Sequence, residues 1–184
     1  MRQLIASLVF IALPGTLFAQ TAKVRPPEIG GHFIGESVAE FLRIEPEVQQ
    51  EVNVCEQHPS KTICDRLLAA VKRGQRTDVS TSSSVNFVLD GGKVVKARMF
   101  VNDLSDAVKA DLTEKFGPRS SETAFPMLNA MGASWEDHIY VWDTPTAYAA
   151  LHEDNNPTLQ SHHFVLVVES PAEHAREYAD AVKQ

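Results

Sequence analysis

The chain has 184 residues, of which 43% are hydrophobic and 22% charged, and its formal net charge at pH 7 is −7. A globular protein of this length and composition can bury the core of one domain. The excess of acidic residues, without a clustered run of Lys and Arg, argues against a nucleic-acid-binding protein and against attachment to an anionic membrane surface.

The N-terminus has the pattern of a secretory signal peptide. Arg2 supplies a positive charge, residues 4–13 form a short apolar segment, and Ala19 is a small residue suited to cleavage before Gln20. An anchor that stays attached is the alternative, but the apolar segment is too short to span roughly 30 Å of hydrocarbon. We therefore expect residues 1–19 to be removed. The mature chain, with no later transmembrane segment, is expected to be soluble and either periplasmic or secreted.

Two cysteines, Cys55 and Cys64, remain in the predicted mature chain. Nearby cysteines in an exported protein favour a disulfide bond, which by the chain-entropy model would contribute about 2.7 kcal/mol. Free thiols and a metal site are the alternatives. The C-x8-C spacing without a second Cys or His pair is a poor zinc motif, so the sequence predicts the disulfide.

The first half of the chain is predicted to be mainly helical. Residues 20–31 contain paired prolines and paired glycines and are predicted to be an extended lead-in. Ser37 and Glu40 have the spacing of a capping box and predict a short helix that ends before Pro46. Apolar residues at helical spacing predict two further helices within 46–74, which the disulfide would join at the break between them.

A β-hairpin and a helix follow. Alternating apolar residues at 85–89, an Asp-Gly-Gly turn at 90–92 and a second apolar run at 94–101 predict the hairpin. The polar segment 78–84 is either the exposed beginning of its first strand or a flexible loop. The helix has apolar residues four apart on one face: Leu104, Val108, Leu112 and Phe116.

Strands dominate the C-terminal third of the chain. Residues 119–133 are predicted to be irregular, and two strands are expected on either side of a turn at 143–145. The most apolar run, 163–169, is predicted to be a central strand. Ser170 and Pro171 begin a last helix. Its expected buried face contains Ala172, Ala175, Tyr178, Ala179 and Val182.

This order of elements predicts the fold class. Helices, a hairpin, a helix, three strands and a final helix indicate an α+β fold, with a mainly antiparallel sheet and helices packed on one face. We expect residues 32–184 to form a single α+β domain.

The sequence offers little support for an enzyme. It contains no G-x-S-x-G, H-E-x-x-H or phosphate-binding glycine motif, and it predicts no catalytic residue, no metal site and no cofactor. His138, His152 and His162 lie near the ends of predicted strands and would converge only in a favourable register. These strand-end histidines support the alternative function of a periplasmic hydrolase or a metal-binding protein.

The strands carry more apolar residues than one covered face requires. If Ile139 and Val141 face the helices, aromatic residues occupy the opposite face, where an antiparallel sheet normally has polar side chains. The predicted exposed binding surface contains Phe100, Tyr140, Trp142 and Tyr148, together with Val165 and Val167. The alternative is that a further layer covers this face and makes it part of the core.

Three short motifs resemble those of small bacterial envelope proteins. They are Gly35, Ser37 and Glu40 near the mature N-terminus, the hairpin turn 90–94, and the Lys-Phe-Gly-Pro helix stop at 115–118. In these motifs the chain is similar to the SmpA/OmlA type, which shares its fold with β-lactamase inhibitor protein modules. The chain departs from that type by lacking a lipid-attachment Cys, by the segment from Cys55 to Cys64, and by a further strand and helix near the C-terminus. The resemblance therefore implies an envelope protein but transfers no functional residues.

Together these observations predict an exported soluble binding or interaction protein of the bacterial cell envelope. The expected partner is either another envelope protein or a small apolar ligand, and no nucleic-acid partner is expected.

Overall fold

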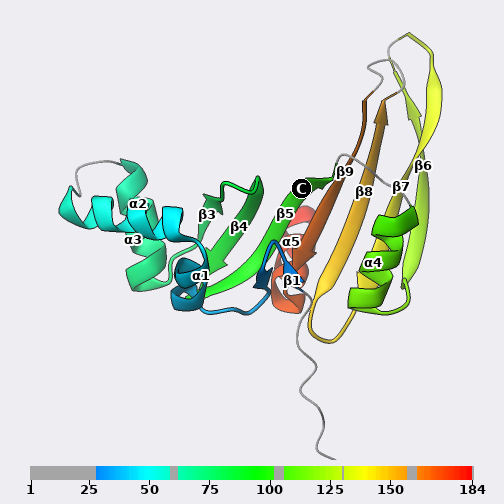
Figure 1. The fold of residues 1–184 in the computed structure, drawn as a ribbon. Helices are drawn as coiled ribbons and strands as arrows, with labels where there is room; N and C mark the ends of the chain where they lie inside the picture. Colours follow the sequence, from blue (N-terminus) through cyan, green and yellow to red (C-terminus); the bar gives the residue numbers. More distant parts are fainter. Residues whose placement is uncertain (1–27, 59–61, 102–105, 130, 157–160, 184) are drawn as a thin grey trace, which may run out of the picture.

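Figure 1 shows a computed structural model, which describes residues 28–58, 62–101, 106–129, 131–156 and 161–183. The predicted signal peptide and residues 20–27 of the predicted lead-in lie outside the described residues. The helices are α1 (Val38–Ile44), α2 (Pro46–Gln57), α3 (Thr62–Arg73), α4 (Asp106–Phe116) and α5 (Pro171–Ala181). The strands are β1 (Glu28–Ile29), β2 (His32–Phe33), β3 (Thr77–Ser80), β4 (Val85–Asp90), β5 (Lys93–Val101), β6 (Ser121–Leu128), β7 (Ser134–Asp143), β8 (Tyr148–Asn156) and β9 (Ser161–Glu169).

A seven-stranded antiparallel sheet organises the fold. Its strand order is β3-β4-β5-β9-β8-β7-β6, and β1 and β2 form a separate two-stranded sheet. β9 is the middle strand, as predicted, and joins the β4–β5 hairpin to the strands that follow α4 (Figure 1). The α+β class with a mainly antiparallel sheet is confirmed.

Local sequence signals position several of these elements. The Ser37 hydroxyl accepts a hydrogen bond from the backbone N–H of Glu40 at 3.2 Å, and Ser170 caps α5 through the N–H of Glu173 at 3.1 Å. The Gly-Gly pair between β4 and β5 has positive φ angles, which this tight turn requires.

The predicted disulfide is confirmed. Cys55 near the end of α2 and Cys64 near the start of α3 are bonded, with their Cα atoms 5.0 Å apart, and both are buried. The bond fixes the two helices to each other at the break between them.

Most helices pack on one face of the sheet, which we call the core face. One row of paired residues marks it across five strands: Phe87, Ala97, Val168, Ala149 and Trp142. Phe41 of α1 lies 5.2 Å from Phe87 between ring centroids, and Leu112 and Phe116 of α4 belong to the same buried cluster. Figure 1 shows α1 and α4 in front of the sheet and α5 behind it.

α5 packs on the opposite face through polar side chains. Glu177 accepts a hydrogen bond from Lys96 Nζ at 2.6 Å, and the His174 ring stacks on Tyr148 with 3.6 Å between ring centroids. Lys96 and Tyr148 belong to one row of that face, since both pair with Glu169.

The predicted buried face of α5 is wrong. Tyr178 and Val182 are 68% and 69% exposed, and Ala172, Ala175 and Ala179 are exposed as well. The residue that α5 buries is Glu173, which is 4% exposed. The apolar spacing identified a helix but not the side that packs, because here ion pairs hold the helix to the sheet.

The predicted orientation of β7 is also wrong. Tyr140 and Trp142 were expected to face away from the helices, but they are 5% and 1% exposed and lie on the core face. β7 has apolar residues in both phases, so its alternation alone cannot show which phase is inward. Pairing settles the orientation, because Trp142 lies opposite Ala149 and Tyr140 opposite Leu151.

β6 lies within the stretch predicted to be irregular. All its residues are exposed, and Pro126 has no backbone N–H to donate to the hydrogen-bond ladder, which a central strand needs on both sides. It is an edge strand that pairs with β7 alone. Similarly, segment 78–84 divides into the edge strand β3 and a turn at which Ser84 has a φ of 61°.

Candidate functional site

An open groove lies on the sheet face opposite the core face. Its volume is about 780 Å³, which is within the range of small-molecule sites in proteins. Each of the seven strands contributes at least one residue to its lining, and α5 contributes Glu177. Because neighbouring strands are about 4.8 Å apart, a groove that crosses all seven of them is elongated, about 29 Å from the first strand to the last.

The floor of the groove is formed by valines. Val88 of β4 and Val165 and Val167 of β9 line it, and both β9 valines are partly exposed. Phe100 of β5 is directly opposite Val165 in the sheet and is 52% exposed. These residues place an apolar strip in a face that still contacts solvent.

At the α5 end of the groove, cations and carboxylates neutralise one another. Arg76 donates two hydrogen bonds to Glu173, at 2.7 and 3.0 Å, and Lys96 contacts Glu177 at 2.6 Å and Glu169 at 3.3 Å. The pairing is the reason that α5 can bury a carboxylate against the sheet.

The carboxylate of Glu173 is strongly perturbed. Hydrogen bonds from Arg176 and Arg76 outweigh the opposing effect of burial and lower the pKa of Glu173 to about 2. Glu173 is therefore ionised at any physiological pH and acts as a structural anion rather than as a proton donor.

In the middle of the groove lie Arg98 and His152. The Arg98 guanidinium carbon is 5.6 Å from the centre of the Phe100 ring, and within the described residues Arg98 forms no ion pair. His152 pairs with Val165 from β8. Burial is the largest cause that lowers the pKa of His152, the charges of Arg98 and Lys96 add to it, and the charge of Glu169 opposes it.

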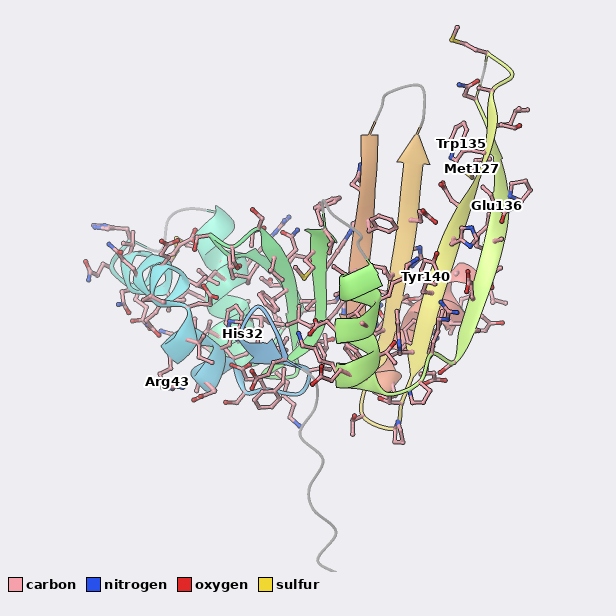
Figure 2. The ribbon with its side chains drawn as sticks, turned by 45° about the vertical axis from the view of Figure 1, so that its right-hand side comes forward. His32, Arg43, Met127, Trp135, Glu136 and Tyr140 are labelled. Atoms are coloured by element: carbon pink, nitrogen blue, oxygen red, sulfur yellow. A yellow bond between two sulfur atoms is a disulfide. The ribbon has the colours of Figure 1, made fainter. Side chains whose placement is uncertain are left out.

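The far wall belongs to the β6–β7 hairpin. Met127 of β6 and Asp137 of β7 line the groove there, and Trp135 is the cross-strand neighbour of Met127. Figure 2 shows Met127 and Trp135 close together on this hairpin. Its apolar side chains Phe125, Met127, Leu128 and Met131 are exposed.

The four aromatic residues of the predicted binding surface do not share one surface. Tyr140 and Trp142 are buried on the core face, where Lys109 Nζ donates a hydrogen bond to the Tyr140 hydroxyl at 3.1 Å. Tyr148 lies on the groove face but is stacked beneath His174 of α5. Only Phe100 is widely exposed beside the groove.

The strand-end histidines His138 and His152 do not lie at one site. His138 contacts Glu122 at 3.1 Å and Glu136 at 3.4 Å, and His152 lies two residues beyond Ala150 on the groove face. The side chain of His162 lies outside the described residues. Where the structure describes the chain, no group of three or more His, Cys, Asp or Glu side chains could hold a metal ion.

A cluster of one histidine and two glutamates was not anticipated from the sequence. His32 Nδ1 lies 3.2 Å from both carboxylate oxygens of Glu36, and Nε2 lies 3.0 Å from Glu45 Oε1. Both His32 and Glu36 are 1% exposed, and the His32 ring packs against Phe41 and Phe87. Since a ligand cannot reach it, this cluster ties the β1–β2 segment to α1 and is structural. Figure 2 shows His32 far from the β6–β7 hairpin.

Comparison of the chain with known proteins finds no matching family model, no matching curated protein and no matching solved structure. Among the helices that the structure describes, none is both long enough and apolar enough to cross a membrane.

Proposed function

We propose that this chain is an exported binding protein of the bacterial cell envelope that holds a small ligand in the groove. The observation that carries the proposal is the groove itself, about 780 Å³ in volume, with a valine floor on a sheet face that α5 covers at one end only. Binding sites commonly combine such an apolar floor with a few polar groups that orient the ligand.

Export is supported by two features of the chain. The N-terminal residues have the charge, apolar segment and small-residue site of a signal peptide. The Cys55–Cys64 disulfide belongs to the kind that persists in oxidising compartments such as the periplasm. The resemblance to SmpA/OmlA-type proteins agrees with an envelope location and is part of the proposal.

The chemistry of the lining favours binding over catalysis. Two of its cations, Arg76 and Lys96, are held by the carboxylates of α5 and of the end of β9. These pairs hold α5 on the sheet, so the role of both cations in the fold is structural. The valine floor adds shape and apolar contact area.

The test uses groove filling and native mass spectrometry. Val165→Trp places a large side chain on the groove floor, and Val54→Trp makes the same change at an exposed position of α2 as the matched control. Each protein is purified gently from cells that export it. We expect a non-covalently bound small molecule on the wild type and on Val54→Trp, and its loss from Val165→Trp. A wild-type protein that carries no bound molecule, or a folded Val165→Trp protein that keeps it, would contradict the proposal.

A further inference from the structure

The charges that line the groove differ in whether they already have partners. Arg76 is paired with Glu173, and Lys96 is paired with Glu169 and Glu177. Arg98 forms no ion pair or hydrogen bond with any residue that the structure describes, although it projects from the middle of the sheet. Arg98 is exposed, and its guanidinium can bind a planar anion because its N–H donors match both oxygens of a carboxylate.

The surroundings of Arg98 are polar toward β4, where its cross-strand neighbour is Asn86, and apolar toward β9. Its cross-strand neighbour on β9 is Val167, and Phe100 and Val165 form the next pair along the same face. His152 completes this row, since it lies opposite Val165 on β8. One cation is therefore bordered on its β9 side by an apolar patch made of Val167, Val165 and Phe100.

We propose that the groove binds amphipathic carboxylates, with the carboxylate on Arg98 and an aliphatic chain along Val165, Val167 and the neighbouring floor. This inference rests on the proposed function and specifies the ligand class. The branched side chains of Val165 and Val167 suit an aliphatic chain, which needs apolar contact but no directed hydrogen bonds. The Phe100 ring, 52% exposed, offers further apolar area beside the anion site.

His152 supports the same assignment from the other side of Val165. Burial and the charge of Arg98 lower the pKa of His152, against an opposing effect of Glu169, and this favours the neutral ring, whose N–H can donate a hydrogen bond to an anion. The charge of Lys96 also acts to lower this pKa. The groove lining also includes the carboxylates of Asp78, Asp137, Glu153 and Glu177, so the anion site is confined to Arg98 itself.

The experiment measures binding of a fluorescent fatty acid, dansyl-aminoundecanoic acid, and of its uncharged methyl ester. The variants are Arg98→Gln, which removes the charge, and Arg98→Lys, which keeps the charge but not the planar fork. Arg43→Gln is the matched control, since Arg43 lies on α1, is exposed and is paired with Glu40 at 2.6 Å (Figure 2). Circular dichroism and thermal unfolding establish that each variant is folded.

We expect the wild type to bind the acid more tightly than the ester. Arg98→Gln should weaken binding of the acid by about tenfold or more while changing binding of the ester less than about twofold, as loss of one charge-assisted contact predicts. Arg98→Lys should lie between them, and Arg43→Gln should match the wild type. Equal affinity of the wild type for acid and ester, unchanged acid binding by Arg98→Gln, or no binding of the acid would each overturn the inference.

The two proposals can fail separately. If native mass spectrometry shows a molecule that Val165→Trp loses but Arg98→Gln retains, the groove is a binding site and the assignment to carboxylates is wrong. If the wild type carries no molecule and binds neither probe, both proposals fail.

Discussion

The clearest quantitative consequence of the structure concerns Glu173 at the start of α5. Its side chain is 4% exposed and receives hydrogen bonds from Arg76 at 2.7 and 3.0 Å and from Arg176 at 2.7 and 3.0 Å. Replacing it by Gln in the variant Glu173→Gln keeps the shape but removes the negative charge. Both arginines then lose their charged partner at the junction of helix and sheet.

The pKa of Glu173 gives the size of the effect. It falls from an ordinary 4.5 to about 2 in the folded protein, which corresponds to at most about 3 kcal/mol of stability at neutral pH. Arg76 and Arg176 are partly exposed, so solvent screens part of this, and we expect Glu173→Gln to lose about 1–2 kcal/mol. Because the folded pKa is depressed, the stabilisation is present above pH 4.5 and is lost as the pH falls toward 2.

The assay is urea unfolding followed by circular dichroism at several pH values between 7 and 3. The difference in unfolding free energy between wild type and Glu173→Gln should be largest at pH 7 and should shrink steadily below pH 4.5. Glu40→Gln is the control, because Glu40 is also paired with an arginine but is exposed on α1, and it should have a smaller effect. A difference that stays constant with pH, or equal losses for the two variants, would refute the reasoning.

Three further predictions concern the core, the disulfide and the groove. In thermal or urea unfolding, Trp142→Ala should lower the free energy of unfolding by about 3–5 kcal/mol, and Phe100→Ala should change it by less than about 0.5 kcal/mol. The reverse order would mean that β7 faces the other way. Replacing Cys55 and Cys64 by Ser should cost about 2–3 kcal/mol, and reducing agent should then no longer lower the melting temperature, as it does for the wild type. An NMR titration of His152 should give a midpoint below 6.5, and a midpoint at or above 6.5 would contradict the groove electrostatics. As the pH falls below 6.5, the wild type should lose more stability than His152→Gln, because the unfolded chain takes up the proton on His152 more readily than the folded chain.

Local chemistry explains which parts of the fold the sequence predicts well. The Ser37 and Ser170 caps, the Gly-Gly turn and the short loop between the cysteines each depend on neighbours within a few residues. The β4–β5 hairpin and the central strand β9 likewise carry strong apolar signals of their own. For these elements, propensity and tertiary structure favour the same conformation.

The errors occur where tertiary pairing overrides the local pattern. β7 has apolar residues in both phases, so Trp142 could be assigned to the core only once it was known to lie opposite Ala149, which in turn lies opposite Val168. β6 is exposed along its whole length and contains Pro126, so it carries no apolar alternation that marks a strand. The sequence of the strand alone therefore shows neither the inward phase of β7 nor the existence of β6.

The groove could not be predicted for a related reason. Arg98, His152 and Val165 come from three strands that are separated along the chain, and only the order β5-β9-β8 brings them together. Of the predicted surface, Phe100, Val165 and Val167 do lie on the groove face. The aromatic residues that made the prediction attractive, Tyr140 and Trp142, instead belong to the core.

The unexpected packing of α5 accounts for the chemistry that remains in the groove. A helix buried through an apolar stripe would have left the cations of this sheet face without partners. α5 instead brings Glu173 and Glu177 to Arg76 and Lys96, and so neutralises the end of the face that it covers. Among the described residues, Arg98 is the cation of the groove lining for which no ion pair is formed. The same ion pairs that hold α5 in place thus leave Arg98 as the side chain proposed to bind the carboxylate.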